Sequence, residues 1–271
     1  AFSKITKSSP AEKNSICLLI FDTIFSPDMI SKSQVKHIRS LEDKKNRYAF
    51  SQFVIEGEKM IAELLNSTFE IVSIYGTENW AEKQQASGLD SSKLTLINEA
   101  ELRRISSLKS PNEVLAIVSM PHVIDIPGIK KAIALDHIQD PGNLGSIIRI
   151  ADWFGIQHIL CSEQTVDVYN PKVLQASMGS IFRVQCHYTD LENYFTVHPD
   201  IPKYACVLDG CDVRQIEGVH EGIVVIGNES KGISHALISF CQHRISIARL
   251  GQAESLNAAI AAGIVCHSLW K

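Results

Sequence analysis

Several common features are missing from this sequence, and each absence excludes a class of protein. The seven cysteines include no Cys-x-x-Cys pair and no zinc spacing, and the ten histidines are equally dispersed. We therefore predict no metal site and reduced, mostly buried thiols, which are typical of a cytoplasmic protein. The formal net charge of −4 excludes a strongly basic nucleic-acid coat protein, so any RNA binding must come from local patches.

An apolar run long enough to cross a membrane is also missing. Residues 16–25 are apolar, but the stretch is short and contains Asp22. Lysines precede it, yet no small-residue cleavage site follows, so we predict neither a membrane span nor a secretory signal. Because the regular pattern begins near Met29, we treat residues 1–28 as an N-terminal extension.

Two runs of alternating strands and helices make up the rest of the chain, and a segment with two prolines and a glycine (119–129) predicts a linker between them. The first run predicts a small α/β domain over residues 29–118. Its expected strands are 53–57, 69–76, 93–97 and 114–118, and its expected helices are 58–65 and 98–107. The second run, 130–271, predicts a mostly parallel sheet covered by helices on both faces. Its expected strands are 132–136, 158–161, 204–208, 222–227 and 244–248, with helices at 144–154, 171–178, 190–197 and 255–270.

Ligands of open parallel sheets bind beyond the carboxyl ends of the strands, and three segments there are unusual. The first is DHIQDPGNLGSIIR (136–149). Gly142 and Gly145 permit a close approach of the backbone to a ligand, and Arg149 follows within an apolar helix. The alternative is that Arg149 forms a surface pair with Asp152, three residues further on.

The other two segments follow the strands 222–227 and 244–248. GNESKG (227–232) places Asn228 and Glu229 between two glycines, and the alternative interpretation is a solvated turn. ARLGQAESLNAAIAAG (248–263) places Ser255 and Asn257 at the start of an alanine-rich helix, and the alternative there is helix capping and close packing.

Taken together, the three segments are far more specific than each is alone. The order Asn-x-Gly-Ser-x-x-Arg, Gly-Asn-Glu-x-x-Gly and Glu-Ser-Leu-Asn resembles the SpoU family, the TrmH-like RNA ribose 2′-O-methyltransferases of the SPOUT superfamily. Residues 44–65 resemble the substrate-binding domain of that family, which is similar to a ribosomal-protein RNA-binding module. Residues 175–184 also fit its larger members.

The resemblance implies a C-terminal α/β trefoil-knot methyltransferase domain, preceded by a small α/β RNA-binding domain. It implies a homodimer with the active site near the interface, and S-adenosyl-L-methionine as the cofactor. The implied reaction is methylation of a ribose 2′-hydroxyl in structured RNA. The separate N-terminal domain favours 23S ribosomal RNA over transfer RNA as the substrate. Because the sulfonium of the cofactor is already an activated electrophile, the reaction needs no metal.

The resemblance also implies roles for individual residues. Arg149 is the central catalytic residue; a guanidinium stays protonated, so we favour a phosphate and oxyanion clamp over a base assisted by a substrate phosphate. Asn143 would orient Arg149 or the ribose, Glu229 would steer the arginine or the substrate, and Ser255 and Asn257 would hold the nucleotide and the cofactor. The expected cofactor pocket consists of Leu208, Gly227, Asn228, Ile247, Leu256 and Asn257.

RNA binding is expected from a basic patch at the start of the N-terminal domain, with Arg39, Lys44, Lys45 and Arg47 as its main members. The alternative is a solvated helix face, since Glu42 and Asp43 interrupt the run. Two other functions are possible for a related protein: a knotted RNA-binding protein without catalysis, and a methyltransferase acting on a base. The first would lack one of the motif residues, all of which are present here, and the second would have different motifs.

Overall fold

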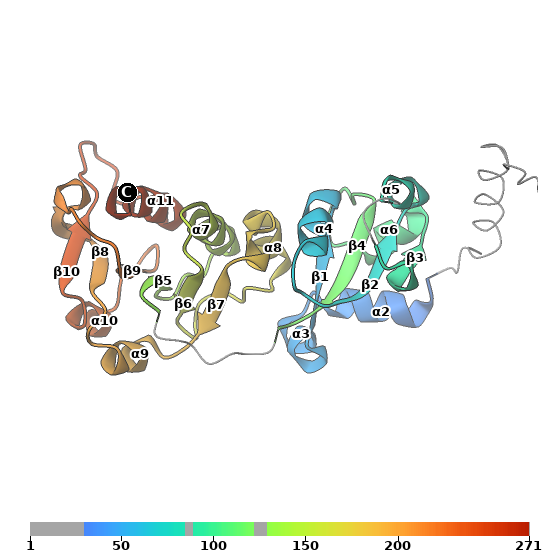
Figure 1. The fold of residues 1–271 in the computed structure, drawn as a ribbon, viewed down its shortest axis with the longest axis horizontal. Coiled ribbons are helices and arrows are strands. Elements are labelled where there is room, and N and C mark those ends of the chain that lie inside the picture. The colour runs from blue at the N-terminus through green and yellow to red at the C-terminus, as the bar shows by residue number, and fades with distance from the viewer. Residues whose placement is uncertain (1–29, 85–88, 122–128, 271) are drawn as a thin grey trace, which may run out of the picture.

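The computed structural model describes residues 30–84, 89–121 and 129–270. The chain forms two α/β units that lie side by side, each built around its own sheet (Figure 1). The N-terminal sheet has the strand order β1-β4-β2-β3, and the C-terminal sheet has the order β10-β8-β9-β5-β6-β7. The predicted α/β fold, with a small N-terminal unit before a domain built on a parallel sheet, is confirmed.

The N-terminal unit has a mixed sheet, because β4 runs antiparallel to both of its neighbours while β2 and β3 are parallel. Its helices α4 and α5 pack on one face of the sheet, and α2 and α6 pack on the other. Its elements are α2 (Lys32–Ser40), α3 (Lys44–Phe50), β1 (Gln52–Glu56), α4 (Glu58–Leu65), β2 (Ile71–Gly76), α5 (Glu78–Lys83), the 3₁₀ turn Ser91–Lys93, β3 (Leu94–Leu96), α6 (Glu99–Ile105) and β4 (Val114–Ser119).

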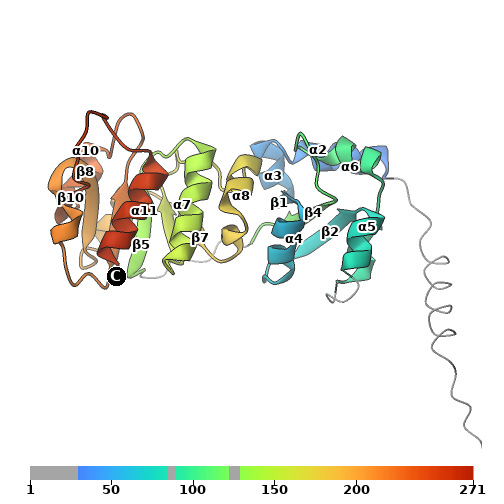
Figure 2. The ribbon, with the colours of Figure 1, turned by 90° about the horizontal axis from the view of Figure 1, so that it is seen from above.

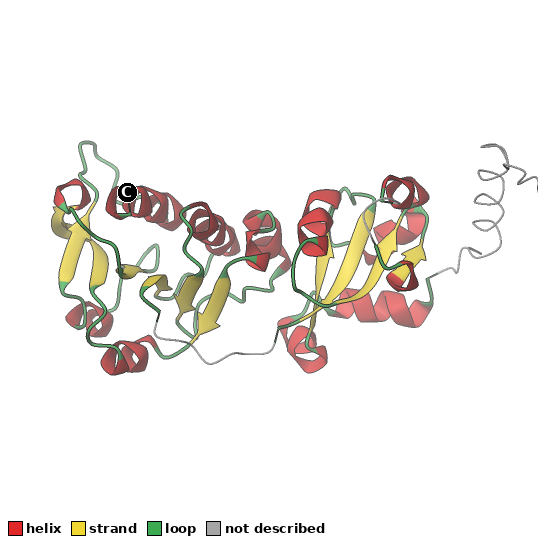
Figure 3. Ribbon diagram, in the orientation of Figure 1, coloured by secondary structure: helices red, strands yellow, loops and turns green. Residues whose placement is uncertain are grey.

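The C-terminal unit has six strands that are all parallel, as expected from the alternation of strands and helices. Helices cover both faces, with α7, α8 and α11 on one side and α9 and α10 on the other (Figure 3). Its elements are β5 (Lys131–Leu135), α7 (Pro141–Trp153), β6 (His158–Cys161), α8 (Pro171–Ser177), the 3₁₀ turn Ser180–Phe182, β7 (Gln185–Tyr188), α9 (Leu191–Val197), β8 (Lys203–Asp212), the 3₁₀ turn Val213–Gln215, β9 (Gly222–Ile226), α10 (His235–Ser239), β10 (His243–Ser246) and α11 (Ala258–Leu269).

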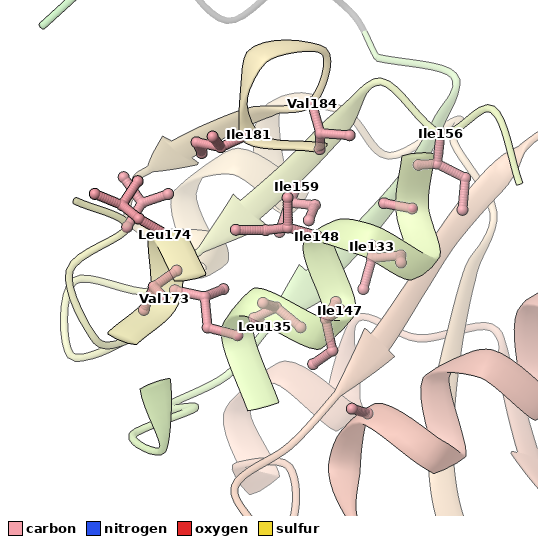
Figure 4. Packing of buried hydrophobic residues seen from close by; sticks show 14 of the residues in the cluster. Ile133, Leu135, Ile147, Ile148, Ile156, Ile159, Val173, Leu174, Ile181 and Val184 are labelled. Carbon is pink, nitrogen blue, oxygen red and sulfur yellow. The ribbon is translucent and has the colours of Figure 1, made fainter. Parts of the chain in front are cut away.

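The position of α7 explains why this helix is apolar. Ile147 and Ile148 point into a core formed with β5, β6 and α8, as Figure 4 shows. Gly145 lies within the helix, where a Cβ atom would come 2.5 Å from Cβ of Ala176 on α8. Gly145 is therefore explained by close helix packing, and the expectation that it serves the approach of a ligand has no support in this geometry.

Several element boundaries differ from the sequence predictions. Helix α7 begins at Pro141 and not at residue 144, because the Asp140 side chain caps it and proline occupies its first turn. Helix α11 begins at Ala258 and not at residue 255, because Asn257 is its cap. Five helices and strands of the described residues were not predicted: α2, α3, α5, β7 and α10.

Some predictions concern parts of the chain that the structure does not describe. The N-terminal extension (1–28) and residues 122–128 of the linker (119–129) lie outside the described residues, and the division into domains stays a prediction. The knot also stays a prediction. Across the described ranges, no helix is both long enough and apolar enough to cross a membrane.

Candidate active site

The three sequence segments meet at one edge of the C-terminal sheet. Strands β5, β9 and β10 are parallel members of this sheet, so their carboxyl ends, and the loops that follow them, lie along the same edge. The loop after β5 leads into α7, the loop after β9 contains Glu229, and the loop after β10 leads into α11. This edge is therefore where chemistry is expected.

Three of the predicted catalytic side chains are joined by hydrogen bonds. The Nδ2 atom of Asn257 donates to Oδ1 of Asn143 at 2.7 Å, and Nδ2 of Asn143 donates to Oε1 of Glu229 at 2.6 Å. These contacts connect all three loops, across 114 and 86 positions of the sequence. We call Asn143, Glu229 and Asn257 the polar network.

Helix caps fix two members of the polar network. The backbone N–H of Asn143 donates to the Asp140 carboxylate at 2.8 Å, which holds Asn143 in the first turn of α7. Asn257 caps α11, since its Oδ1 accepts from the N–H groups of Ala259 and Ile260. The capping interpretation is thus correct for the Oδ1 atom of Asn257. Its Nδ2 atom also belongs to the polar network.

The loop after β9 is a tight turn that presents Glu229. The Asn228 side chain accepts from the N–H groups of Ser230 and Lys231, and Asn228 and Gly232 exchange two backbone hydrogen bonds. A Cβ atom on Gly227 would collide with the backbone of Gly232. The solvated-turn interpretation describes the backbone, while the bond to Asn143 gives Glu229 a fixed position.

Arg149 lies on the exposed side of α7 and is not hydrogen-bonded to the polar network. Among the described residues it has no hydrogen-bond or ion-pair partner, and the amide of Asn143 is used by Glu229 and Asn257 instead. The alternative pairing of Arg149 with Asp152 is wrong, because Asp152 accepts from Arg183 and Ser180. An exposed guanidinium without a partner can bind an external anion such as phosphate.

Ser255 is not part of the polar network, and its predicted role toward the nucleotide and cofactor stays a prediction. Ser255 is exposed, lies two residues before the Asn257 cap, and makes no hydrogen bond to any described residue. Its hydroxyl is therefore open to solvent and available to a ligand.

The predicted cofactor residues fit a partly apolar ligand. Leu208 on β8 and Leu256 before α11 leave 78 % and 47 % of their surface exposed at this edge, and Ile247 after β10 is half-buried. Apolar side chains left open beside loop backbone are what an adenine ring requires. The residues present thus fit S-adenosylmethionine.

Comparison with known families agrees with this geometry. Residues 130–267 match the SpoU rRNA methylase family, and residues 32–116 match the MRM3-like substrate binding domain. The chain belongs to the SpoU rRNA methylase family. Its N-terminal unit corresponds to the substrate-binding domain, and the polar network lies in the part that matches the methylase.

Individual relatives resemble the chain over nearly its whole length. The 23S rRNA (guanosine(2553)-2′-O)-methyltransferase RlmP of Bacillus subtilis is 29 % identical over 240 residues, which cover 87 % of this chain and 95 % of the relative. A structure from Porphyromonas gingivalis, assigned to the TrmH family of RNA methyltransferases, is 32 % identical with a TM-score of 0.81, covering 89 % of this chain and 98 % of the other. An AdoMet-bound rRNA methyltransferase from Sinorhizobium meliloti is 30 % identical with a TM-score of 0.76, covering 88 % and 95 %.

The predicted RNA-binding residues of this SpoU protein do not form one surface. Lys44 and Lys45 are exposed. Arg39 is half-exposed, donates to the carbonyl of Ser106 at 2.6 Å and pairs with a neighbouring glutamate. Arg47 is buried and paired with Asp167, so the prediction that it contacts RNA is wrong. The reason is that α3 turns Arg47 toward the C-terminal unit while the two lysines face solvent.

One supporting residue was missed in the sequence. Asp136 is buried at the end of β5, and its Oδ2 accepts from the N–H of Ser234 at 2.7 Å, which connects β5 to the segment after β9. The next residue, His137, has a φ of 59°, and Asn228 donates to its carbonyl. The available signal was an aspartate as the last residue of a predicted buried strand (132–136).

The described residues include His, Cys, Asp and Glu, the side chains that hold metal ions. Within residues 30–84, 89–121 and 129–270, no three His, Cys, Asp or Glu side chains are grouped so that they could hold a metal ion. The absence of a metal site stays a prediction.

Proposed function

We propose that this protein transfers the methyl group of S-adenosylmethionine to a ribose 2′-hydroxyl of 23S ribosomal RNA. The observation that carries the proposal is the polar network, formed from three distant loops of a SpoU-family chain. The Bacillus subtilis relative is named for this reaction on 23S rRNA, and the Sinorhizobium meliloti relative was solved with AdoMet bound. These likenesses favour ribosomal over transfer RNA as the substrate.

Arg149 acts in this proposal as a clamp for negative charge. A ribose hydroxyl is a poor nucleophile that must lose its proton during attack, and a phosphate lies next to it in RNA. A guanidinium stays protonated, so it binds the phosphate and the developing oxyanion and does not take the proton. Its fork of N–H donors matches two oxygens at once.

The polar network orients the hydroxyl. Oε1 of Glu229 is bonded to Asn143, while its other carboxylate oxygen has no partner among the described residues. That oxygen can accept a hydrogen bond from the ribose hydroxyl and take up its proton as the ribose oxygen attacks the methyl group. Asn143 and Asn257 keep that carboxylate in place, and holding the attacking atom in line supplies much of the rate enhancement.

The cofactor is assigned to the neighbouring loops. When bound, S-adenosylmethionine supplies a methyl group activated by its sulfonium. Leu208, Ile247 and Leu256 would cover its apolar part, and the turn at Gly227 and Asn228 would offer backbone groups. Ser255 is assigned to the nucleotide that enters the site.

A homodimer is part of the proposal. Trp153 on α7 is 84 % exposed, and Ile260 and Ile264 on α11 are also exposed beside the shallow depression between these helices. Apolar surface of this kind marks an interface, and a second copy would cover it and enclose the neighbouring Arg149. We expect Ile260→Asp to give monomers in light scattering, while Val197→Asp on α9 leaves the assembly unchanged. A monomeric wild-type protein would contradict the dimer.

We also propose a cytoplasmic location. The six cysteines in the described part of the chain are all free, as expected where thiols stay reduced, and the proposed substrate is ribosomal RNA.

The test is methyl transfer from radiolabelled S-adenosylmethionine to RNA from a strain that lacks this protein. We expect label in a 2′-O-methylnucleoside of 23S rRNA, with loss of transfer in Arg149→Ala. Lys130→Ala, which removes an exposed cation at the opposite end of β5, should keep full activity. Label on a base, label in transfer RNA alone, or no transfer to any RNA would each overturn the proposal.

A further inference from the structure

The contact between the two units contains a buried ion pair. Nε and Nη2 of Arg47 donate to Oδ2 of Asp167 at 3.1 and 2.6 Å, and the two side chains are only 3 % and 5 % exposed. Nη1 of Arg47 donates to the carbonyls of Leu41 and Glu42. The guanidinium is thus satisfied from both units, and we call Arg47 and Asp167 the junction pair.

The second oxygen of Asp167 holds the same helix. The hydroxyl of Tyr48 donates to Oδ1 of Asp167 at 3.0 Å. Burial, together with the nearby carboxylate of Asp167, raises the pKa of Tyr48, so the hydroxyl keeps its proton and remains a donor. Two consecutive residues of α3 are therefore bound to one carboxylate of the C-terminal unit.

Apolar packing surrounds the junction pair. Phe53 lies 4.6 Å from Tyr169 and Phe69 lies 5.3 Å from Phe182, measured between ring centroids. One cluster of buried apolar residues continues from the N-terminal sheet into the C-terminal sheet. A second ion pair across the junction, Arg183 with Glu63, is exposed.

A buried ion pair is an unusual way to join two units connected by a linker. Removing two charges from water is costly, and the cost is recovered only when the partners keep one exact geometry. Apolar contacts alone would tolerate small rotations. The junction pair therefore favours a single arrangement of the units.

The junction also fixes the helix that presents Lys44 and Lys45, because α3 is the helix that contains Arg47. Figure 1 shows α3 on the lower side of the N-terminal unit and α11, whose amino-terminal end carries the polar network, on the upper side of the C-terminal unit, so an RNA that contacts both must cross the junction, which Figure 2 shows from above. Nucleotides bound on α3 would then lie at a set distance from the site.

We propose that Arg47 and Asp167 are positioning residues, which hold the RNA-binding helix α3 at a fixed distance from the methyl-transfer site and so select which ribose is methylated. This inference rests on the proposed function. It assigns the junction pair no contact with the reacting atoms.

The experiment compares full-length Asp167→Asn and Arg47→Lys with the wild type, and uses Glu63→Gln at the exposed pair as the matched control. Asp167→Asn removes the negative charge of the pair, and Arg47→Lys removes the two parallel N–H donors of the guanidinium. Both changes should loosen the junction. We expect a larger radius of gyration in X-ray scattering and a fall in kcat/KM for RNA of about tenfold or more. The Kd for S-adenosylmethionine should stay within about twofold, because the cofactor loops are untouched.

Mapping of the 2′-O-methyl positions separates positioning from simple destabilisation. A smaller folded fraction would lower methylation equally at every ribose, whereas a loosened junction should raise the share of methylation at neighbouring riboses. Glu63→Gln should keep the wild-type pattern. If Asp167→Asn does not fold, Tyr48→Phe, which removes one hydrogen bond, should show the same changes at smaller size.

Folded variants that methylate the wild-type ribose alone, with unchanged kcat/KM and scattering, would overturn the proposal. A wild-type protein that transfers no methyl group to RNA would overturn the proposed function instead. In that case the scattering comparison still decides whether the junction pair holds the two units together.

Discussion

Two arginines, Arg47 on α3 and Arg149 on α7, have opposite surroundings. Arg47 is buried at the junction of the two units and uses its guanidinium on Asp167 and two carbonyls. Arg149 is exposed, without a hydrogen-bond or ion-pair partner in the described part of the chain. A buried guanidinium that is bonded to acceptors of the protein is not accessible to RNA, while an exposed one can bind an incoming phosphate.

The same contrast separates the regions around them. The junction is closed, with aromatic rings and a continuous apolar core on either side of the ion pair. The site edge is open, and its polar groups hold one another in place while leaving acceptors and apolar side chains uncovered. The closed region supplies stability and geometry, and the open region is available for ligands.

The largest expected effect compares the stability of two alanine variants. Arg47→Ala leaves the Asp167 carboxylate buried and unpaired, and should lower the free energy of unfolding by about 3–5 kcal/mol. Arg149→Ala removes an exposed side chain and should change that free energy by no more than about 0.5 kcal/mol. Urea unfolding measures both. Equal losses of unfolding free energy in the two variants would contradict the difference between the buried Arg47 and the exposed Arg149.

The next effect concerns the polar network at the open site. Asn143→Ala separates Glu229 from Asn257 and should lower the rate of methyl transfer roughly 10²-fold in single-turnover experiments. Adding Glu229→Ala should cost little more, because the two residues act as one unit. Asn193→Ala, at an exposed asparagine of α9 on the other face of the sheet, is the control and should keep the wild-type rate. If the rate losses of the two single variants add up in the double variant, Asn143 and Glu229 act independently.

A smaller effect distinguishes the two sides of α3. Lys44 and Lys45 share this helix with Arg47 but face solvent. Reversing both charges to glutamate should weaken RNA binding and reduce the slope of log affinity against log salt by about 1–2. Cofactor affinity and stability should not change, and the single charge reversal Lys130→Glu, at an exposed lysine outside α3, serves as the control. Unaltered RNA affinity would remove these lysines from the RNA-binding surface.

The smallest effect is a pH dependence located away from both arginines. His158 on β6 and His187 on β7 are hydrogen-bonded at 3.1 Å, and burial lowers the pKa of both below the ordinary 6.5. As the pH falls below about 6.5, the unfolded chain takes up protons that the folded chain does not, so stability should fall with pH. The Tm of His187→Gln should fall less than that of the wild type between pH 7.5 and 5.5. Parallel Tm curves would contradict this.

The sequence predictions were most successful where local chemistry decides the outcome. Asn143, Glu229 and Asn257 each followed a strand of a predicted parallel sheet, and the rule for such sheets brings them to one edge. Their mutual hydrogen bonds could not be predicted, because those depend on side-chain positions fixed by the caps at Asp140 and Asn257. The sequence prediction begins helix α7 at residue 144 because the apolar pattern starts at Leu144, whereas the Asp140 cap and Pro141 start the helix one turn earlier.

The sequence by itself determined the alternation of strands and helices, the glycines and caps at the loops, and the motif set of the SpoU family. Only the tertiary structure decided which charges are buried. Arg47 and Asp167 are 120 positions apart, and a seven-residue helix with several charges does not indicate which of them faces another unit. Burial depends on contacts between distant segments, whereas motifs and helix caps depend on neighbours in the chain.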